Sequence, residues 1–413
     1  MSPASAPRTR LPRNLWVVTA TSFLNDVSSE MLLNLLPLFL ANVLGVRTGL
    51  IGLIEGVSEA TASLLKVFSG WISDRLQRRK SLAVIGYALS TTAKPFLYLA
   101  NSWGWVLGVR FADRLGKGIR TAPRDALVAE TVDARHRGLA FGLHRAGDTA
   151  GAVIGLALAL AILLRLQGIG APLERSAFQV VVLVSLIPAV LAVLVLALGA
   201  TEVSPGAGPS APPRLSLAGF DQRFRVYLVI IALFTLGNSS DAFLILRAQD
   251  AGLSVPGILG MMITFNLVYA LVSIPAGSLS DRVGRRRLLI GGWSLYAAVY
   301  FGFSRITAGW QAWALMGVYG IYYGLTEGAA RAFVADLVPA DRRGTAFGVY
   351  HAAIGLMAFP ASLLAGILWQ GIGGWAGLGP SAPFALGAVL ALAAVVLLSR
   401  LRGPSAPQEG GHT

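Results

Sequence analysis

The residues best able to do chemistry in this 413-residue chain are charged side chains placed inside long apolar stretches. Asp26 and Glu30 are four positions apart, so a helix places both carboxylates on one face. An ionisable group inside a bilayer costs at least about 2.5–3.5 kcal/mol on insertion scales, so it normally faces a cavity or a partner. Since desolvation and nearby charge change how readily a carboxylate is protonated, we expect this pair to bind protons or a cationic substrate.

Other charges also fall within apolar stretches. Glu55, Glu59 and Lys66 lie within about 40° of one another on a helical wheel, and for Lys66 we predict a partner in its own helix. A static lattice of salt bridges is the alternative to proton or substrate binding. The residues predicted to form the proton-coupling or substrate cavity are Asp26, Glu30, Glu55, Glu59, Arg110, Arg114, Lys117, Arg120, Asp241, Glu327 and Arg331.

The segment RFADRLGKGIRTAPRD at 110–125 holds five cations and two carboxylates. It is not a phosphate-binding loop, because Phe111 and Gly118 stand where that motif needs a glycine and a serine or threonine. Its seven charges occupy an arc of about 140° on a helical wheel. A loop has no reason to sort charges in this way, so we predict a helix whose charged face meets a watery cavity.

The composition indicates an integral membrane protein. Hydrophobic residues make up 55% of the chain and charged residues 13%, with a mean hydropathy of +0.66, whereas soluble domains average about 25% charged residues. The chain has no cysteine and only four histidines, which leaves no material for thiol chemistry and little for a metal site. We expect no metal, no cofactor and no enzymatic activity. A soluble nucleic-acid binder is excluded despite the formal charge of +14.

Elements that could position these charges are apolar stretches of membrane-spanning length. With 110–125 as a twelfth span, both termini fall on one side, and the short segments of that side hold twenty Lys and Arg against five on the other. Such an asymmetry places both termini in the cytoplasm. The other eleven spans are predicted at 14–41, 49–73, 81–100, 139–164, 177–200, 224–246, 256–277, 288–304, 310–334, 345–369 and 382–401.

An internal repeat divides the chain into two halves of six spans. RGLAFGLHRA at 137–146 recurs as RGTAFGVYHA 206 residues later. We therefore predict an all-α fold of two six-helix bundles with the same topology, related by pseudo-two-fold symmetry. The expected parts are an N-terminal tail (1–13), a first bundle (14–200), a linker (201–223), a second bundle (224–402) and a C-terminal tail (403–413).

Two loop segments carry a motif. The segment GSLSDRVGRRR at 277–287 follows the pattern G-x-L-a-D-R-x-G-R-R-x, and GWISDRLQRRK at 70–80 repeats it with Ile72 and Gln77 as departures. In this the chain resembles the major facilitator superfamily of twelve-span secondary transporters. That resemblance implies a gate on the cytoplasmic face, in which Asp74 meets the helix start near 344 and Asp281 the one near 138. The implied gate residues are Gly70, Asp74, Arg75, Arg78, Arg79, Gly277, Asp281, Arg282, Arg285 and Arg286.

Two further family patterns match in part. The span-four pattern R-x-x-Q-G-x-G-x-A appears with Lys117 in place of glutamine and Arg120 in place of glycine. The span-five pattern of exporters, G-x-x-x-G-P-x-x-G, keeps its three glycines, but Ala152 replaces its proline.

The function expected from these observations is secondary active transport by alternating access in the plasma (inner) membrane, by a monomer. The favoured form is a proton-coupled exporter of a small organic molecule. A carrier for an organic anion, by symport or exchange, is the alternative, because cations share one face of 110–125. A channel and a non-transporting membrane sensor are rivals of other classes. The expected partners are the lipid bilayer, the substrate and protons, and no nucleic acid.

Overall fold

The structure is a computed structural model that describes residues 12–76, 78–132, 137–203, 217, 219–339 and 342–401, without the side chains at 74, 137, 138, 274, 278 and 281. Helices account for most of the described residues, and no strand occurs among them beyond an isolated bridge between Ile372 and Trp375. The all-α prediction is confirmed. The expected N-terminal tail, linker and C-terminal tail fall mostly outside the described residues.

The first half contains six spans, two of them made of consecutive helical segments. The first span joins α1 (Arg13–Leu33), α2 (Leu36–Leu38) and η1 (Phe39–Val43), with a break next to Pro37. The third joins α4 (Arg79–Ala93) and η2 (Lys94–Leu97). The others are α3 (Thr48–Leu76), α5 (Trp103–Thr131), α6 (Arg137–Leu166) and α7 (Arg175–Gly199).

The second half repeats this order. Its first span is interrupted between α8 (Gln222–Gly237) and α9 (Asp241–Asp250), where Ser240 caps the second piece through the amide of Ala242. The remaining spans are α10 (Val255–Val283), α11 (Arg285–Arg305), α12 (Gly309–Leu337), α13 (Arg343–Gln370) and α14 (Ala382–Arg400).

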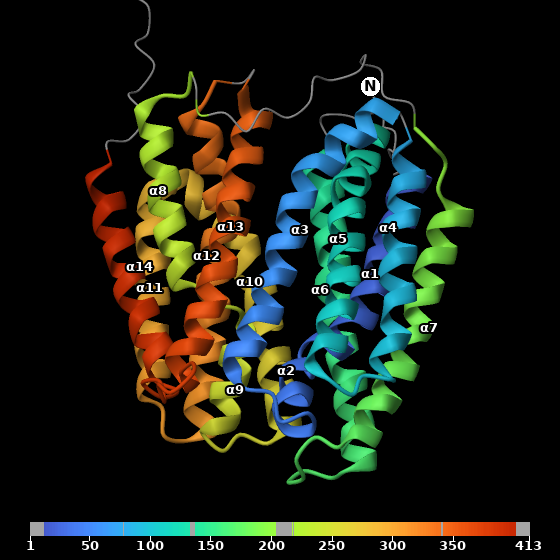
Figure 1. Cartoon of the computed structure of the whole chain (residues 1–413). Helices are drawn as coiled ribbons and strands as arrows, with labels where there is room; N and C mark the ends of the chain where they lie inside the picture. The colour runs from blue at the N-terminus through green and yellow to red at the C-terminus, as the bar shows by residue number, and fades with distance from the viewer. Residues whose placement is uncertain are drawn as a thin grey trace, which may run out of the picture.

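The two halves stand side by side as two bundles (Figure 1). Across their boundary α3 packs on α13 and α6 packs on α10. We call the face that carries the start of α1 at Arg13 and the end of α14 at Arg400 the terminal face, and the other the opposite face (Figure 1). Because an even number of spans returns the chain to its starting side, this arrangement agrees with twelve spans.

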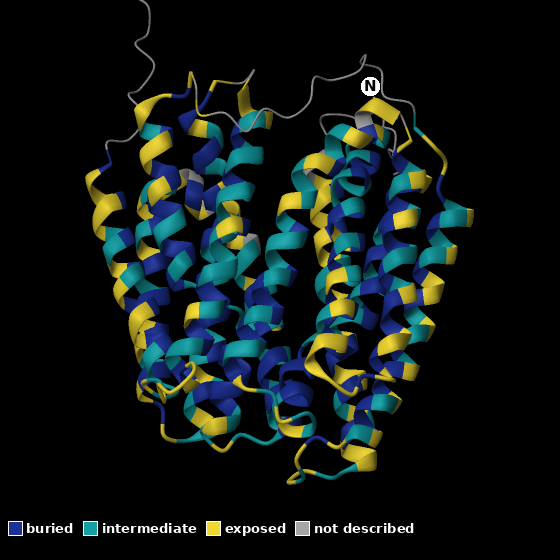
Figure 2. Cartoon of the chain, in the orientation of Figure 1, coloured by how far each residue is buried: buried dark blue, intermediate teal, exposed yellow. Residues whose placement is uncertain are grey.

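Apolar side chains cover the outside of the bundles. Figure 2 shows exposed residues along the outer helices, and Leu198, Val229 and Leu271 are 65–79% exposed. Six segments of the described chain are long and apolar enough to cross a membrane by length and composition alone. They comprise α6, α7, α8 with α9, the first part of α10, α13 and α14. Spans such as α5 do not meet this criterion because they contain several charged residues. A membrane span tolerates such residues where they face other helices rather than lipid.

Glycines let the charged helices approach one another closely. A Cβ atom at Gly151 or Gly155 of α6 would collide with the backbone of α1 at Phe23 and Val27. Likewise, a Cβ at Gly116 of α5 would meet the amide of Ser90 on α4 at 2.8 Å. Small residues promote this kind of packing between membrane helices. The span-five glycines therefore have a structural role in holding α6 against α1.

Candidate functional site

The charged segment 110–125 lies in the second half of α5, so the prediction of a fourth span is confirmed. Three of its four arginines are buried rather than open to water: Arg110, Arg114 and Arg120 are 3–7% exposed. Nη2 of Arg110 donates to both carboxylate oxygens of Glu55 on α3, at 3.0 and 2.9 Å. The expectation that all these cations face a watery cavity is thus wrong for the three arginines.

The buried side chains of Arg114 and Arg120 on α5 also have partners within the first bundle. Arg114 lies 3.5 Å from Glu59 and 3.8 Å from Asp113. Arg120 donates to Ser90 Oγ at 2.8 Å, and its guanidinium lies over the ring of Tyr87. These contacts satisfy charge inside the first bundle and cost less than unpaired cations would. Lys117 differs, because it is exposed and forms no ion pair with a described residue.

Asp26 and Glu30 are half-buried on α1 and have amide rather than cationic partners. Asn25 Nδ2 donates to Asp26 Oδ1 at 3.1 Å, and Asn34 Nδ2 donates to Glu30 Oε2 at 2.8 Å. Neither carboxylate forms an ion pair within the part of the chain that the structure describes. On α9, Asp241 accepts a hydrogen bond of 3.1 Å from Tyr319 and likewise has no ion pair among the described residues. A complete lattice of salt bridges therefore does not account for these three carboxylates.

Contacts between α3 and α13 close the opposite face. Arg47 Nη2 donates to the carbonyl of Gln370 at 2.7 Å, and the amide of Thr48 donates to Gln370 Oε1 at 2.7 Å. Nearer the middle, Ser240 Oγ of the second half lies 3.4 Å from Glu55 Oε2. Glu55 thus joins its ion pair with Arg110 to the boundary between the halves.

A polar cavity of about 630 Å³ lies between the halves towards the terminal face. Glu327 of α12 is its central acceptor: Arg145 of α6 donates to it across the boundary at 3.1 Å, and Arg331 at 2.7 Å. The hydroxyl of Tyr269 on α10 accepts a hydrogen bond from Arg145 and donates one to Glu327. The charged residues that line the cavity are Lys66, Arg124, Asp125, Asp148, Arg145, Arg285, Glu327 and Arg331, along with His144.

The predicted site residues fall into two groups. Glu327 and Arg331 line the cavity, whereas the residues on α1, α3, α5 and α9 do not line it. The intrahelical partner predicted for Lys66 is wrong, because Lys66 lines the cavity and forms no ion pair with a described residue. Sequence reasoning missed Arg145 and Tyr269 as cavity residues. The sequence feature that could have indicated Arg145 is that it lies with Asp148 as a charged pair inside an apolar span.

Each copy of the loop motif pairs one arginine with the end of a helix in its own half, but through different motif positions. Arg79, the tenth residue of the first copy, pairs with Glu130 at the end of α5, at 2.6 Å. Arg285, the ninth residue of the second copy, pairs with Asp336 at the end of α12. Arg75 lies over the Trp71 ring, and Arg286 donates to carbonyls at the end of α14. The latches expected of Asp74 and Asp281 fall outside the described side chains and stay predictions.

Comparison with known proteins decides the family. The profile of the Major Facilitator Superfamily matches residues 18–261 and 227–413, which together span nearly the whole chain. The chain belongs to the major facilitator superfamily. Family and fold thus identify this major facilitator as a multi-pass membrane transporter.

Three comparisons describe its relatives. An uncharacterised MFS-type transporter of Methanocaldococcus jannaschii is 36% identical over 87% of this chain and 89% of its own length. A protein named as a probable 4-methylmuconolactone transporter, from Cupriavidus pinatubonensis, is 27% identical over 67% of this chain and 65% of its own. Among solved structures, a D-xylose–proton symporter superposes with a TM-score of 0.74 at 15% identity, covering 95% of this chain and 98% of that one. That likeness concerns the fold.

Proposed function

We propose that this major facilitator is a proton-coupled antiporter that exports a small organic molecule by alternating access. In this proposal the terminal face is cytoplasmic, in a plasma (inner) membrane, as the excess of Lys and Arg on that side supports. The cavity then opens towards the cytoplasm while α3 and α13 close the outer side. Substrate and protons would meet the protein from opposite sides in turn.

The observation that carries the proposal is that neither Asp26 nor Glu30 forms an ion pair with a described residue. An ionised carboxylate in a membrane interior is costly unless a cation or water compensates it. Among the described residues their side chains have only amide hydrogen-bond donors, so an occluded state favours their neutral form and a hydrated state favours loss of the proton. Alternation between such states couples proton movement to the conformational change. The paired carboxylate of Glu55 is the contrast, because Arg110 already compensates its charge.

Proton coupling is tested in liposomes of purified protein. A thermal-shift screen of organic cations and anions first selects the compound that stabilises the protein most, and its movement is then driven by a pH gradient. We expect the double variant Asp26→Asn, Glu30→Gln to lose pH-driven accumulation while it retains counterflow of the same compound. Glu174→Gln is the matched control, because Glu174 is exposed at the start of α7. Undiminished pH-driven accumulation in the double variant would reject the proposal.

A second candidate is a carrier for an organic anion. It is favoured by the polar cavity, where five cations and three carboxylates are found among the described lining residues. The relative named as a 4-methylmuconolactone transporter agrees with an organic substrate. Arg331→Gln removes a cation that is 55% exposed. Loss of binding for every anion tested, with cation export intact, would favour this candidate over the first. A non-transporting sensor would accumulate none of these compounds under the pH gradient.

A further inference from the structure

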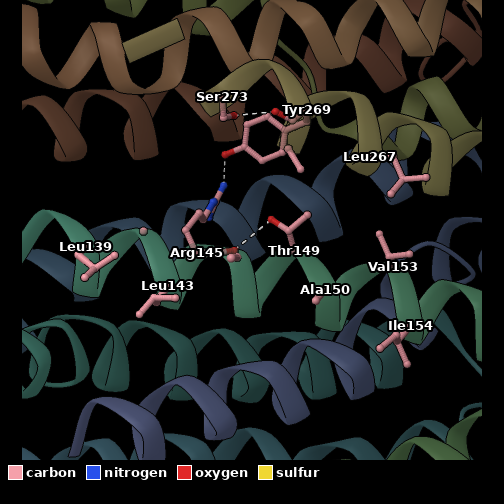
Figure 3. Close-up of a pocket in the computed structure, with 13 residues that line it drawn as sticks. Leu139, Leu143, Arg145, Thr149, Ala150, Val153, Ile154, Leu267, Tyr269 and Ser273 are labelled. Carbon is pink, nitrogen blue, oxygen red and sulfur yellow. Dashed lines mark hydrogen bonds between the residues drawn. The ribbon is translucent and has the colours of Figure 1, made fainter. Parts of the chain in front are cut away.

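A second hollow lies beside the polar cavity, between α6 and α10. Its volume is about 830 Å³, within the range of small-molecule sites. Figure 3 shows Leu139, Leu143 and Val153 of α6 around it, with Leu267 of α10 across the gap. Leu139 and Leu267 are 55% and 48% exposed, so the groove opens on the apolar surface of the protein. A membrane-embedded groove of this kind is accessible to an alkyl chain.

Small residues on α6 create the groove. This helix carries two rows of them, and the row that includes Gly151 and Gly155 is filled by the backbone of α1. The other row is Gly142, Ala146 and Ala150, which are all exposed and line the groove. A Cβ added at Gly142 would meet no atom within 4 Å. The second row therefore has no packing partner among the described residues and leaves room for a ligand.

The groove and the polar cavity share one wall. Arg145, Tyr269 and Ser273 line both hollows. Figure 3 shows the Arg145 side chain extending from α6 towards Tyr269, so a cation stands where the apolar space meets the polar one. A ligand lying across this wall has its apolar part on α6 and α10 and its polar part in the cavity.

The polar end carries uncompensated positive charge. Arg145 and Arg331 share the single carboxylate of Glu327 and remain 53% and 55% exposed. Lys66 lines the same cavity and forms no ion pair with a described residue. Arg124 is already paired with Asp125 at 2.8 Å, and Arg285 with Asp336. Lys66, Arg145 and Arg331 thus share the cavity with two carboxylates, Glu327 and Asp148, which leaves one positive charge in excess. An anionic headgroup fits this excess through charge-assisted hydrogen bonds.

We propose that the groove and the cavity together bind an amphipathic anion with a single alkyl chain, which enters from the bilayer between α6 and α10. The chain would lie along Ala146, Ala150 and Leu267, and the headgroup would meet Arg145, Arg331 and Lys66. This inference rests on the proposed transport function and names the substrate class for it. A cationic amphiphile is disfavoured because it would face the same three cations.

Binding of radiolabelled dodecanoate to purified protein in phosphatidylcholine nanodiscs tests the site. Ala150→Trp fills the groove, and we expect it to weaken dodecanoate binding about tenfold or more, since several methylenes lose their contact. Ala157→Trp is the matched control: Ala157 is exposed on α6 but does not line the groove, and binding should change less than about twofold. Equal dodecanoate affinity in Ala150→Trp and Ala157→Trp would overturn the proposal.

The charge requirement is tested with Lys66→Gln, which breaks no ion pair with a described residue. We expect this variant to bind dodecanoate about tenfold more weakly, because a charge-assisted contact is lost. Its binding of dodecyltrimethylammonium should be unchanged or tighter. Equal binding of the two amphiphiles by the unchanged protein would show that the groove holds bilayer lipid without selection, which overturns the site. Asp26→Asn, Glu30→Gln separates the two proposals: lost proton coupling concerns the transport mechanism, whereas dodecanoate binding there should persist.

Discussion

At the scale of single residues, the choice of partner separates two kinds of membrane carboxylate. Glu55 receives two hydrogen bonds from Arg110, and both residues are less than 10% exposed. Asp26 and Glu30 are more accessible, and their only side-chain donors among the described residues are asparagines. The charge of a carboxylate paired with a guanidinium is compensated by that partner, whereas an amide donor leaves the charge uncompensated. The first kind builds the bundle and the second is suited to coupling.

The Glu55–Arg110 pair should therefore stabilise the folded protein. We predict that Arg110→Met lowers the thermal stability of the purified protein strongly, because a buried charge without its partner costs about 3–5 kcal/mol. Glu55→Gln combined with Arg110→Met should recover much of that loss, since no buried charge is left. Melting in detergent gives the comparison. A double variant less stable than Arg110→Met alone would show that the pair has another role.

At the scale of helices, small residues determine which faces meet. Gly151 and Gly155 bring α6 onto α1, and Gly56 brings α3 onto α13, where a Cβ would lie 2.9 Å from the Phe359 carbonyl. Gly142 stands on the open face of α6. Glycine spacing in the sequence does not tell these faces apart, because both rows repeat at about one helical turn. The family pattern recovers the first row only.

Two leucine substitutions on α6 compare these faces. Gly151→Leu should destabilise the protein by several degrees or prevent folding, because its Cβ would enter the backbone of α1 at Phe23. Gly142→Leu should be neutral or mildly stabilising: glycine in a helix costs roughly 0.5–1 kcal/mol relative to alanine, and nothing described lies within 4 Å of the added Cβ. The yield and melting temperature of each variant give the answer. Similar losses in both would contradict the assigned packing.

At the scale of the whole molecule, the sequence predicts architecture better than it predicts the site. The excess of Lys and Arg on one side and the repeat identify α5 as a span, and each copy of the loop motif supplies one arginine that pairs with the end of α5 or α12, in Arg79–Glu130 and Arg285–Asp336. These features are local or periodic. The ion pair between Arg145 and Glu327 joins residues 182 positions apart in different halves, so only the packing of the bundles brings them together. The prediction of an intrahelical partner for Lys66 is wrong for the same reason: the packing of the two bundles, which the sequence does not show, places Lys66 at the cavity between them.

Alternating access requires the contacts of the opposite face to break in every cycle. Thr48 donates to Gln370 across the boundary between α3 and α13, and the chain has no native cysteine to complicate a cross-link. We predict that Thr48→Cys with Gln370→Cys, joined through disulfides by a short bis-methanethiosulfonate reagent, loses substrate counterflow in liposomes and regains it when a reductant cleaves these disulfides. Either single cysteine treated in the same way should transport normally. Full counterflow by the cross-linked protein would mean that α3 and α13 stay together during transport, and the moving boundary would then have to lie at α6 and α10.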